Sequence, residues 1–151
     1  MKITDALRAE HRILRTQLDS LEQLLGAGAT LAGLRGGAAQ LAAPLLVHAH
    51  IEDELLFPAL ESHIGAGSGP LAVMHAEHEE IERGLTAIDA LQGVEDLQET
   101  LAHVLDVARQ HFIKEDEVLF PMAEALLDGD VLEKLSEELS RRRSDQPFDP
   151  A

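Results

Sequence analysis

Two motifs of the form His-x-x-x-Glu, His48 to Glu52 and His111 to Glu115, bear most directly on chemistry. A spacing of four residues puts the two side chains of each motif one turn apart on one face of an α-helix, within reach of a common metal ion. The sequence contains no cysteine, so any metal ion must be held by nitrogen and oxygen. Such a ligand set suits iron or manganese better than a structural zinc ion. The two motifs therefore predict a site for these metals.

The motifs lie in a segment that occurs twice, as HAHIEDELLFP at 48–58 and as HFIKEDEVLFP at 111–121. A glutamate followed by a histidine precedes each copy, at Glu10 and His11 and again at Glu77 and His78. The repeat indicates two related helix pairs, which a four-helix bundle would bring together about a pseudo-twofold axis.

Four segments with helical periodicity are separated by glycine-rich breaks near 26–33, 62–69 and 92–94. We therefore predict an all-α fold, an antiparallel up-down four-helix bundle over residues 1–128. Residues 129–151 are expected to form a short C-terminal helix near 131–142, opened by Asp130 and Glu133 as a capping box, and a frayed tail. The apolar seam of the fourth segment is expected to continue past Glu115 through Val118, Met122 and Ala125.

Every seam carries a histidine, and counting residues from turns near 28 and 94 puts all four at one height in the bundle. These are His11, His48, His78 and His111. Lysine and arginine are missing from the seams, and burying unpaired carboxylates costs several kcal/mol or more each. Bound cations would neutralise Glu52 and Glu115. The two copies of the motif and the matched heights favour bound metal over a metal-free polar layer. A purely structural bundle with incidental histidines predicts neither the repeat nor the matched heights.

In these residues the chain resembles the hemerythrin-like, or HHE cation-binding, domains. The order EH, HxxxE with LFP, EH, HxxxE with LFP runs through about the first 125 residues. The resemblance implies a centre of two iron ions joined by an oxo or hydroxo bridge. It implies as iron ligands His11, His48, His78 and His111, with Glu52 and Glu115 as bridging carboxylates.

The sequence departs from the oxygen-carrying hemerythrins at two points. Those proteins have two histidines four apart in the third helix, where this chain has Met74 and His78. His75 lies just beside the seam and is a candidate fifth imidazole. Their last bridging group is an aspartate five residues after its histidine; Asp116 stands at that spacing here, but we prefer Glu115 because it lies on the seam.

We do not expect the remaining polar and aromatic residues near the motifs to be metal ligands. We expect His50, His63 and His103 to be ordinary surface or boundary histidines. Solvated or ligand-orienting roles are expected for Asp53, Glu54, Asp116 and Glu117. Core packing beside the site is expected for Phe57 and Phe120. Pro58 and Pro121 are expected to kink or end their helices.

Composition narrows the classes of partner. The formal net charge of −16 repels phosphate backbones and anionic lipid surfaces, and the absence of Tyr and Trp argues against base-stacking platforms. No segment is long and apolar enough to cross a bilayer, and the N-terminus lacks an apolar signal region. We therefore expect a cytoplasmic protein without nucleic-acid or membrane partners.

Two classes of function follow from the resemblance. The first is a module that reversibly binds O2 or a related small ligand, NO or peroxide, for sensing, carriage or storage. The second is a stress enzyme that consumes peroxide or NO, or a donor of iron for iron–sulfur cluster repair. Such repair proteins usually carry an additional cysteine-containing N-terminal domain. Ferritin-like iron oxidation or storage ranks lower, because no seam glutamate precedes a seam histidine by three residues.

Overall fold

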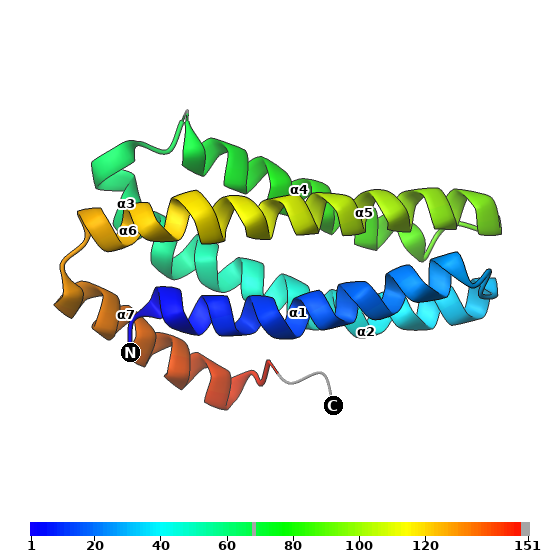
Figure 1. The fold of residues 1–151 in the computed structure, drawn as a ribbon, viewed down its shortest axis with the longest axis horizontal. Coiled ribbons are helices and arrows are strands. Elements are labelled where there is room, and N and C mark those ends of the chain that lie inside the picture. Colours follow the sequence, from blue (N-terminus) through cyan, green and yellow to red (C-terminus); the bar gives the residue numbers. More distant parts are fainter. Residues whose placement is uncertain (68, 149–151) are drawn as a thin grey trace.

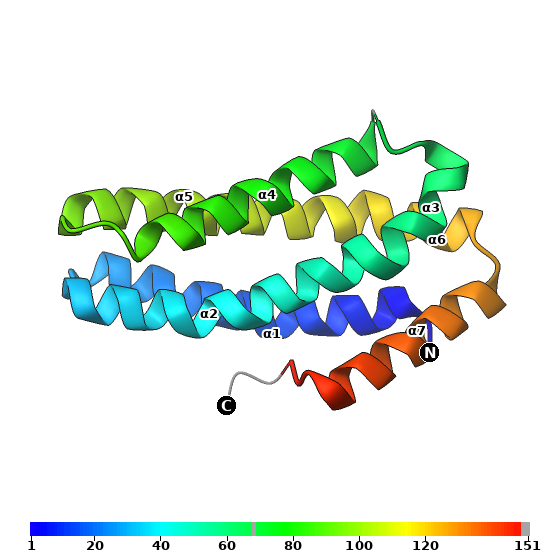
Figure 2. The ribbon, with the colours of Figure 1, turned by 180° about the vertical axis from the view of Figure 1, so that it is seen from behind.

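The computed structural model describes residues 1–67 and 69–148, and these residues form helices without any strand. Four long helices run up, down, up and down (Figure 1), which confirms the predicted bundle. They are α1 (Ile3–Gly26), α2 (Leu31–Ile51), α4 (Pro70–Ile88) and α5 (Val94–Lys114). Helix α1 lies beside α2, and α4 lies beside α5, in both ribbon views (Figure 2). None of the described helices has the length and apolarity that crossing a membrane requires.

The predicted breaks lie where the long helices turn around. Gly28 has a φ of 68°, a left-handed conformation that suits glycine, and it lies between α1 and α2. The Thr30 side chain then caps α2 by accepting a hydrogen bond from the N–H of Gly33. Pro70 is the first residue of α4, where its missing N–H leaves no helical hydrogen bond unmade.

Both prolines of the repeat follow a π-helical turn and do not end their helices. The turns are η1 (Glu52–Leu56) and η2 (Glu115–Leu119), and they lead into α3 (Phe57–Ile64) and α6 (Phe120–Leu126). In η1 the N–H of Phe57 donates to the carbonyl of Glu52, five residues back, and Phe120 and Glu115 repeat this bond in η2. The wider turn brings Pro58 and Pro121 into the first turn of the following helix, where proline is tolerated.

The π turn changes which residues are buried beyond Glu115, so the predicted continuation of the fourth seam was wrong. Val118 is 53% exposed and Ala125 is also exposed, while Leu119 and Ala123 are buried. A π turn holds one residue more than the α-helical pattern allows, so the buried face moves along the chain. The sequence pattern alone assumed an unbroken α-helix.

Two apolar clusters fill the bundle, one on each side of a polar layer. The cluster nearer the α1–α2 turn includes Leu14 and Leu45, and the cluster nearer α3 and α6 includes Leu7 and Leu55. On α1 the buried His11 lies between Leu7 and Leu14, so it separates the two clusters. The polar layer is therefore closed by hydrocarbon at both ends.

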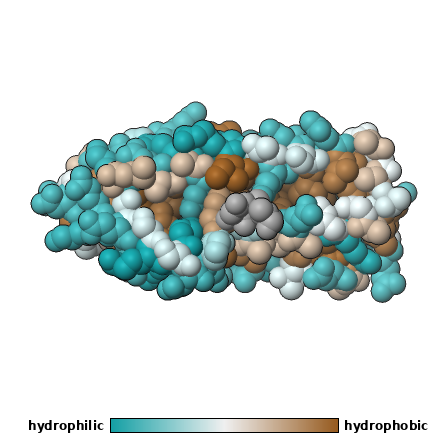
Figure 3. All heavy atoms as spheres, turned by 90° about the horizontal axis from the view of Figure 1, so that it is seen from below, coloured by the Kyte–Doolittle hydropathy of each residue, from teal (hydrophilic) through white to brown (hydrophobic). Residues whose placement is uncertain are grey.

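Helix α7 (Gly129–Asp145) is longer than the predicted C-terminal helix. Its N-cap residue is Asp128. The helix packs along α1, on the side away from α4 and α5 (Figure 1). Ion pairs between Glu138 and Arg142 within the helix support its last turns. After α7, Phe148 is buried; residues 149–151 of the predicted tail lie outside the described residues. Hydrophilic side chains are dense over the α7 half of the face in Figure 3.

Two helical glycines allow a matched test of packing. A Cβ at Gly84 would lie 2.3 Å from Cγ2 of Val104, whereas a Cβ at the exposed Gly36 would meet nothing within 4 Å. Gly84→Ala should therefore lower the free energy of unfolding by about 1–3 kcal/mol through overpacking. Gly36→Ala should raise it by about 0.5–1 kcal/mol, because alanine is the better helix former.

Urea denaturation of the metal-free variants, followed by circular dichroism, measures both changes. Equal stabilisation by the two substitutions would contradict the close α4–α5 contact at Gly84.

Candidate metal centre

One buried layer contains an imidazole from each of the four long helices. His11 comes from α1, His48 from α2, His78 from α4 and His111 from α5. Their exposed fractions are 0%, 1%, 7% and 1%. Glu52 and Glu115, the first residues of the two π turns, are fully buried in the same layer. The structure thus brings together six of the seven predicted ligands.

These six side chains form two overlapping groups that share both glutamates. One group is His11, His48, Glu52 and Glu115, and the other is Glu52, His78, His111 and Glu115. Within each group the potential ligand atoms all lie within 4.8 Å of one another. Two adjacent ion positions, each with two imidazoles and access to both carboxylates, match this arrangement.

The histidines turn their Nε2 atoms toward the centre of the layer. His11 Nε2 lies 3.2 Å from Glu115 Oε1, and His78 Nε2 lies 3.2 Å from Glu52 Oε1. The Nε2 atoms of His11 and His48 are 3.1 Å apart, and those of His78 and His111 are 3.0 Å apart. Each histidine pair therefore converges on one small volume beside the glutamates.

A carboxylate fixes the other nitrogen of every ring. His11 Nδ1 donates to Asp116 at 2.8 Å, and His78 Nδ1 donates to Asp53 at 2.9 Å. His48 Nδ1 donates to Glu10 at 2.8 Å, and His111 Nδ1 donates to Glu77 at 3.1 Å. A carboxylate can only accept, so Nδ1 carries the proton and a neutral ring keeps the Nε2 lone pair for a metal ion.

The hydrogen bonds of the buried carboxylates indicate whether the layer fits a metal ion. Both carboxylate oxygens of Glu52 and both of Glu115 are buried and have no hydrogen-bond partner among the described residues. Buried polar atoms are normally satisfied, and unpaired carboxylates are the costliest exceptions. Nitrogen and carboxylate oxygen ligands without thiolate suit iron and manganese. The six residues present can hold such ions.

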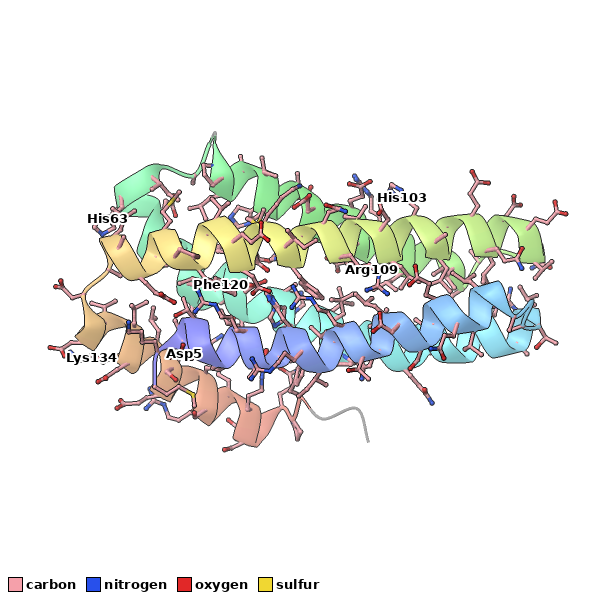
Figure 4. All side chains as sticks on the ribbon, in the orientation of Figure 1. Asp5, His63, His103, Arg109, Phe120 and Lys134 are labelled. Atoms are coloured by element: carbon pink, nitrogen blue, oxygen red, sulfur yellow. The ribbon has the colours of Figure 1, made fainter. Side chains whose placement is uncertain are left out.

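Aromatic and aliphatic side chains surround the layer. The Phe112 ring stacks on His11 with 4.3 Å between centroids, and Phe57 stacks on His78 at 5.5 Å. Phe120, labelled in Figure 4, points from α6 toward α1 and lies 5.3 Å from the His11 ring. A cavity of about 10 Å³ adjoins the histidines and has room for about one water molecule. Its lining residues are Leu45, Leu46, His48, Ala49, His78, Ile81, His111 and Phe112.

Residues 2–123 match the family model of the hemerythrin HHE cation-binding domain. The chain belongs to the hemerythrin HHE family. A curated relative is the iron-sulfur cluster repair protein DnrN of Neisseria gonorrhoeae, which is 31% identical over 94 residues. That match covers 58% of this chain and 60% of the relative, so it spans little more than half of either protein. No solved structure matches the chain significantly.

The structure places the other predicted residues of this hemerythrin-like chain outside the layer. His75 is 44% exposed, and its Nδ1 lies 3.0 Å from Asp53 Oδ1, so it contacts a carboxylate that orients His78 and not the shared centre. His50 is exposed, and His63 and His103 lie on the outer side of the bundle (Figure 4). The His103 ring contacts Glu80 at the surface.

Sequence reasoning missed three residues that contact the histidines. Glu10 orients His48, and Glu77 orients His111. The repeat contained a signal for both, because each glutamate directly precedes a seam histidine in it. Phe112 stacks on His11, and it follows His111 directly in the sequence. Asp53 and Asp116 lie at the histidine rings, as expected for ligand-orienting groups, whereas Glu54 contacts Arg142 of α7.

In the metal-free protein, protons compensate the buried carboxylates. Burial by itself would lower the pKa of His48, but the charge of Glu52 and the hydrogen bond to Glu10 outweigh it and raise the pKa to about 10. Burial would also lower the pKa of His78, but the hydrogen bonds to Asp53 and Glu52 outweigh it and raise the pKa to about 9. Burial would raise the pKa of Glu52, but the charge on His48 holds it well below the usual range.

These pKa shifts predict how the stability of the metal-free protein depends on pH. The folded state keeps protons on His48 and His78 between their ordinary pKa of 6.5 and folded values of about 10 and 9. The unfolded state binds fewer protons in that window, so the free energy of unfolding should fall as the pH rises from 6.5 to 10. The stabilisation should be fully present below pH 6.5.

Urea midpoints of the metal-free protein at intervals across that pH range test this expectation. His48→Gln removes one titrating ring and should show a shallower decline. A midpoint that stays constant or rises toward alkaline pH would contradict the assigned proton distribution.

Proposed function

We propose that this chain is a non-haem di-iron protein that binds a small ligand, O2 or the related NO or peroxide. The observation that carries the proposal is the buried layer in which four imidazoles face two carboxylates that have no hydrogen-bond partner in the described part of the chain. His11, His48, His78 and His111 would hold the two ions from the sides, and Glu52 and Glu115 would bridge them. A bound iron pair would supply reversible redox chemistry and a coordination position for the ligand.

The residues of the chain define what the site can admit. Glu10, Glu77, Asp53 and Asp116 hold the rings with Nε2 inward, so the ligand atoms are positioned before any ion arrives. The phenylalanine rings and the two apolar clusters exclude bulk water. The adjoining cavity has room for about one water molecule and is too small for an organic substrate.

The metal content of protein produced in iron-supplemented medium tests the site. We expect about two irons per chain in the wild type. Glu52→Ala and Glu115→Ala should each lose most or all of the metal, because each removes a carboxylate shared by both positions. Glu54→Ala is a matched control, since Glu54 lies in the same π turn as Glu52 but contacts Arg142, and this variant should keep its iron. Full metal content in both bridging variants would contradict the proposed ligands.

Exposure of the reduced, iron-loaded protein to O2 tests the ligand. Reversible binding predicts a visible charge-transfer band that appears with O2 and disappears when O2 is removed. The same titration with NO or peroxide establishes which ligand the site prefers. Absence of a reversible band with each of the three ligands would contradict the binding function.

The second candidate function is donation of iron for iron–sulfur cluster repair, and the name of the relative from Neisseria gonorrhoeae favours it. The match spans 60% of that relative, so its role is a hypothesis for this chain. Incubation of the iron-loaded protein with a cluster-depleted iron–sulfur protein, sulfide and a reductant separates the two functions. Cluster formation faster than with the same amount of free iron supports donation, whereas a stable O2 complex without transfer supports binding.

A further inference from the structure

The two halves of the metal layer are pseudo-symmetric, but the side chains that fix their outer carboxylates differ. We call His11 and His48 the first half and His78 and His111 the second half. In the first half Arg15 donates to Asp116 at 2.6 Å. Arg143 of α7 donates to Glu10 through two nitrogens, at 2.8 and 2.9 Å. Both outer carboxylates of the first half are thus held by guanidinium groups.

In the second half the outer carboxylates contact a lysine and a histidine instead. Lys114 contacts Glu77, and the His75 ring contacts Asp53 at 3.0 Å. Lys114 is 46% exposed and His75 is 44% exposed, whereas Arg15 is 35% exposed and Arg143 only 15%. An ammonium group on a flexible exposed stem holds a carboxylate less firmly than a planar guanidinium with two parallel hydrogen bonds.

Helix α7 and the residues after it cover the first half of the metal layer. It lies along α1 and places Phe148 6.5 Å from the His48 ring, with the Arg143 guanidinium over the Phe148 ring at 5.5 Å. Among the described residues no helix covers the α4–α5 side in the same way (Figure 1). His78 is also the most exposed of the four candidate imidazoles, at 7%.

We propose that the two ion positions are inequivalent: the position at His78 and His111 exchanges its ion quickly, and Arg143 keeps the position at His11 and His48 closed. This inference rests on the proposed two-metal site. An ion leaves only when a ligand ring rotates away from it. Rotation of His48 must break its bond to Glu10, which two further bonds anchor to Arg143. Rotation of His78 must break its bond to Asp53, and Asp53 has the half-exposed imidazole of His75 as its further anchor. Arg143 is therefore a positioning residue that acts through Glu10.

Release of iron to a chelator tests the inference. The full chain loaded anaerobically with two equivalents of Fe(II) is mixed with excess ferrozine, and the coloured complex is followed with time. We expect two phases of equal amplitude with rates that differ by about tenfold or more. His78→Ala should remove the fast phase, and His11→Ala should remove the slow phase. A single phase from the wild type, or loss of the slow phase in His78→Ala, would overturn the proposal.

Arg143→Gln should accelerate the slow phase by about tenfold and leave the fast phase unchanged. Arg143→Lys, which keeps the charge but loses the paired hydrogen bonds, should fall between the wild type and Arg143→Gln. Arg142→Gln is the matched control: Arg142 is the neighbouring α7 residue, its partners are Glu54 and Glu138, and neither phase should change. Thermal unfolding of the metal-free variants checks that α7 remains folded.

The outcomes separate this inference from the proposed function. A wild type that binds no iron would remove the metal site itself. A wild type that binds two irons and releases them at one rate would remove only the inequivalence. Acceleration of both phases by Arg143→Gln, or of neither, would overturn the role of Arg143.

Discussion

Two glutamate side chains in the middle of a four-helix bundle, without hydrogen-bond partners among the described residues, are the constraint on which the rest of the structure depends. Glu52 and Glu115 are fully buried, and their negative charge must be compensated. Imidazoles from all four long helices face them, and protons on His48 and His78 compensate the charge when no metal is bound. Bound cations would compensate the same charge, because Nε2 lone pairs and carboxylate oxygens would then converge on a positive centre.

The duplicated sequence explains how so many polar groups meet without disturbing the core. Each copy of the repeat, with the helix before it, contributes two histidines, one inner glutamate and two outer carboxylates. The π turns at both copies place an inner glutamate and an outer aspartate at consecutive positions, Glu52 with Asp53 and Glu115 with Asp116. Both side chains of each pair reach the layer, one at its centre and the other at a ring nitrogen. The two halves of the metal layer differ in their outermost contacts, because Arg143 of α7 donates to Glu10 in the first half.

Most of the fold could be predicted from local sequence. Helical periodicity, the glycine-rich breaks and the repeat were enough for the bundle and for the convergence of six candidate ligands, since heights along antiparallel helices follow from counting residues. The π turns could not be predicted, because an α-helical pattern continues through them, and Val118 was consequently misplaced. The contact between Arg143 and Glu10 spans 133 residues, and no local pattern specifies such a pairing. The exposure of His75 depends on the orientation of α4, which a seam position alone leaves undetermined.

Anomalous X-ray scattering at the iron absorption edge, measured on crystals of the iron-loaded protein, tests the central claim most directly. Two buried side chains of like charge should have two metal ions between them. The predicted result is two anomalous peaks per chain, one between His11 and His48 and one between His78 and His111, each within bonding distance of both Glu52 and Glu115. Iron found only at surface carboxylates, with the six buried side chains bonded to one another, would contradict it.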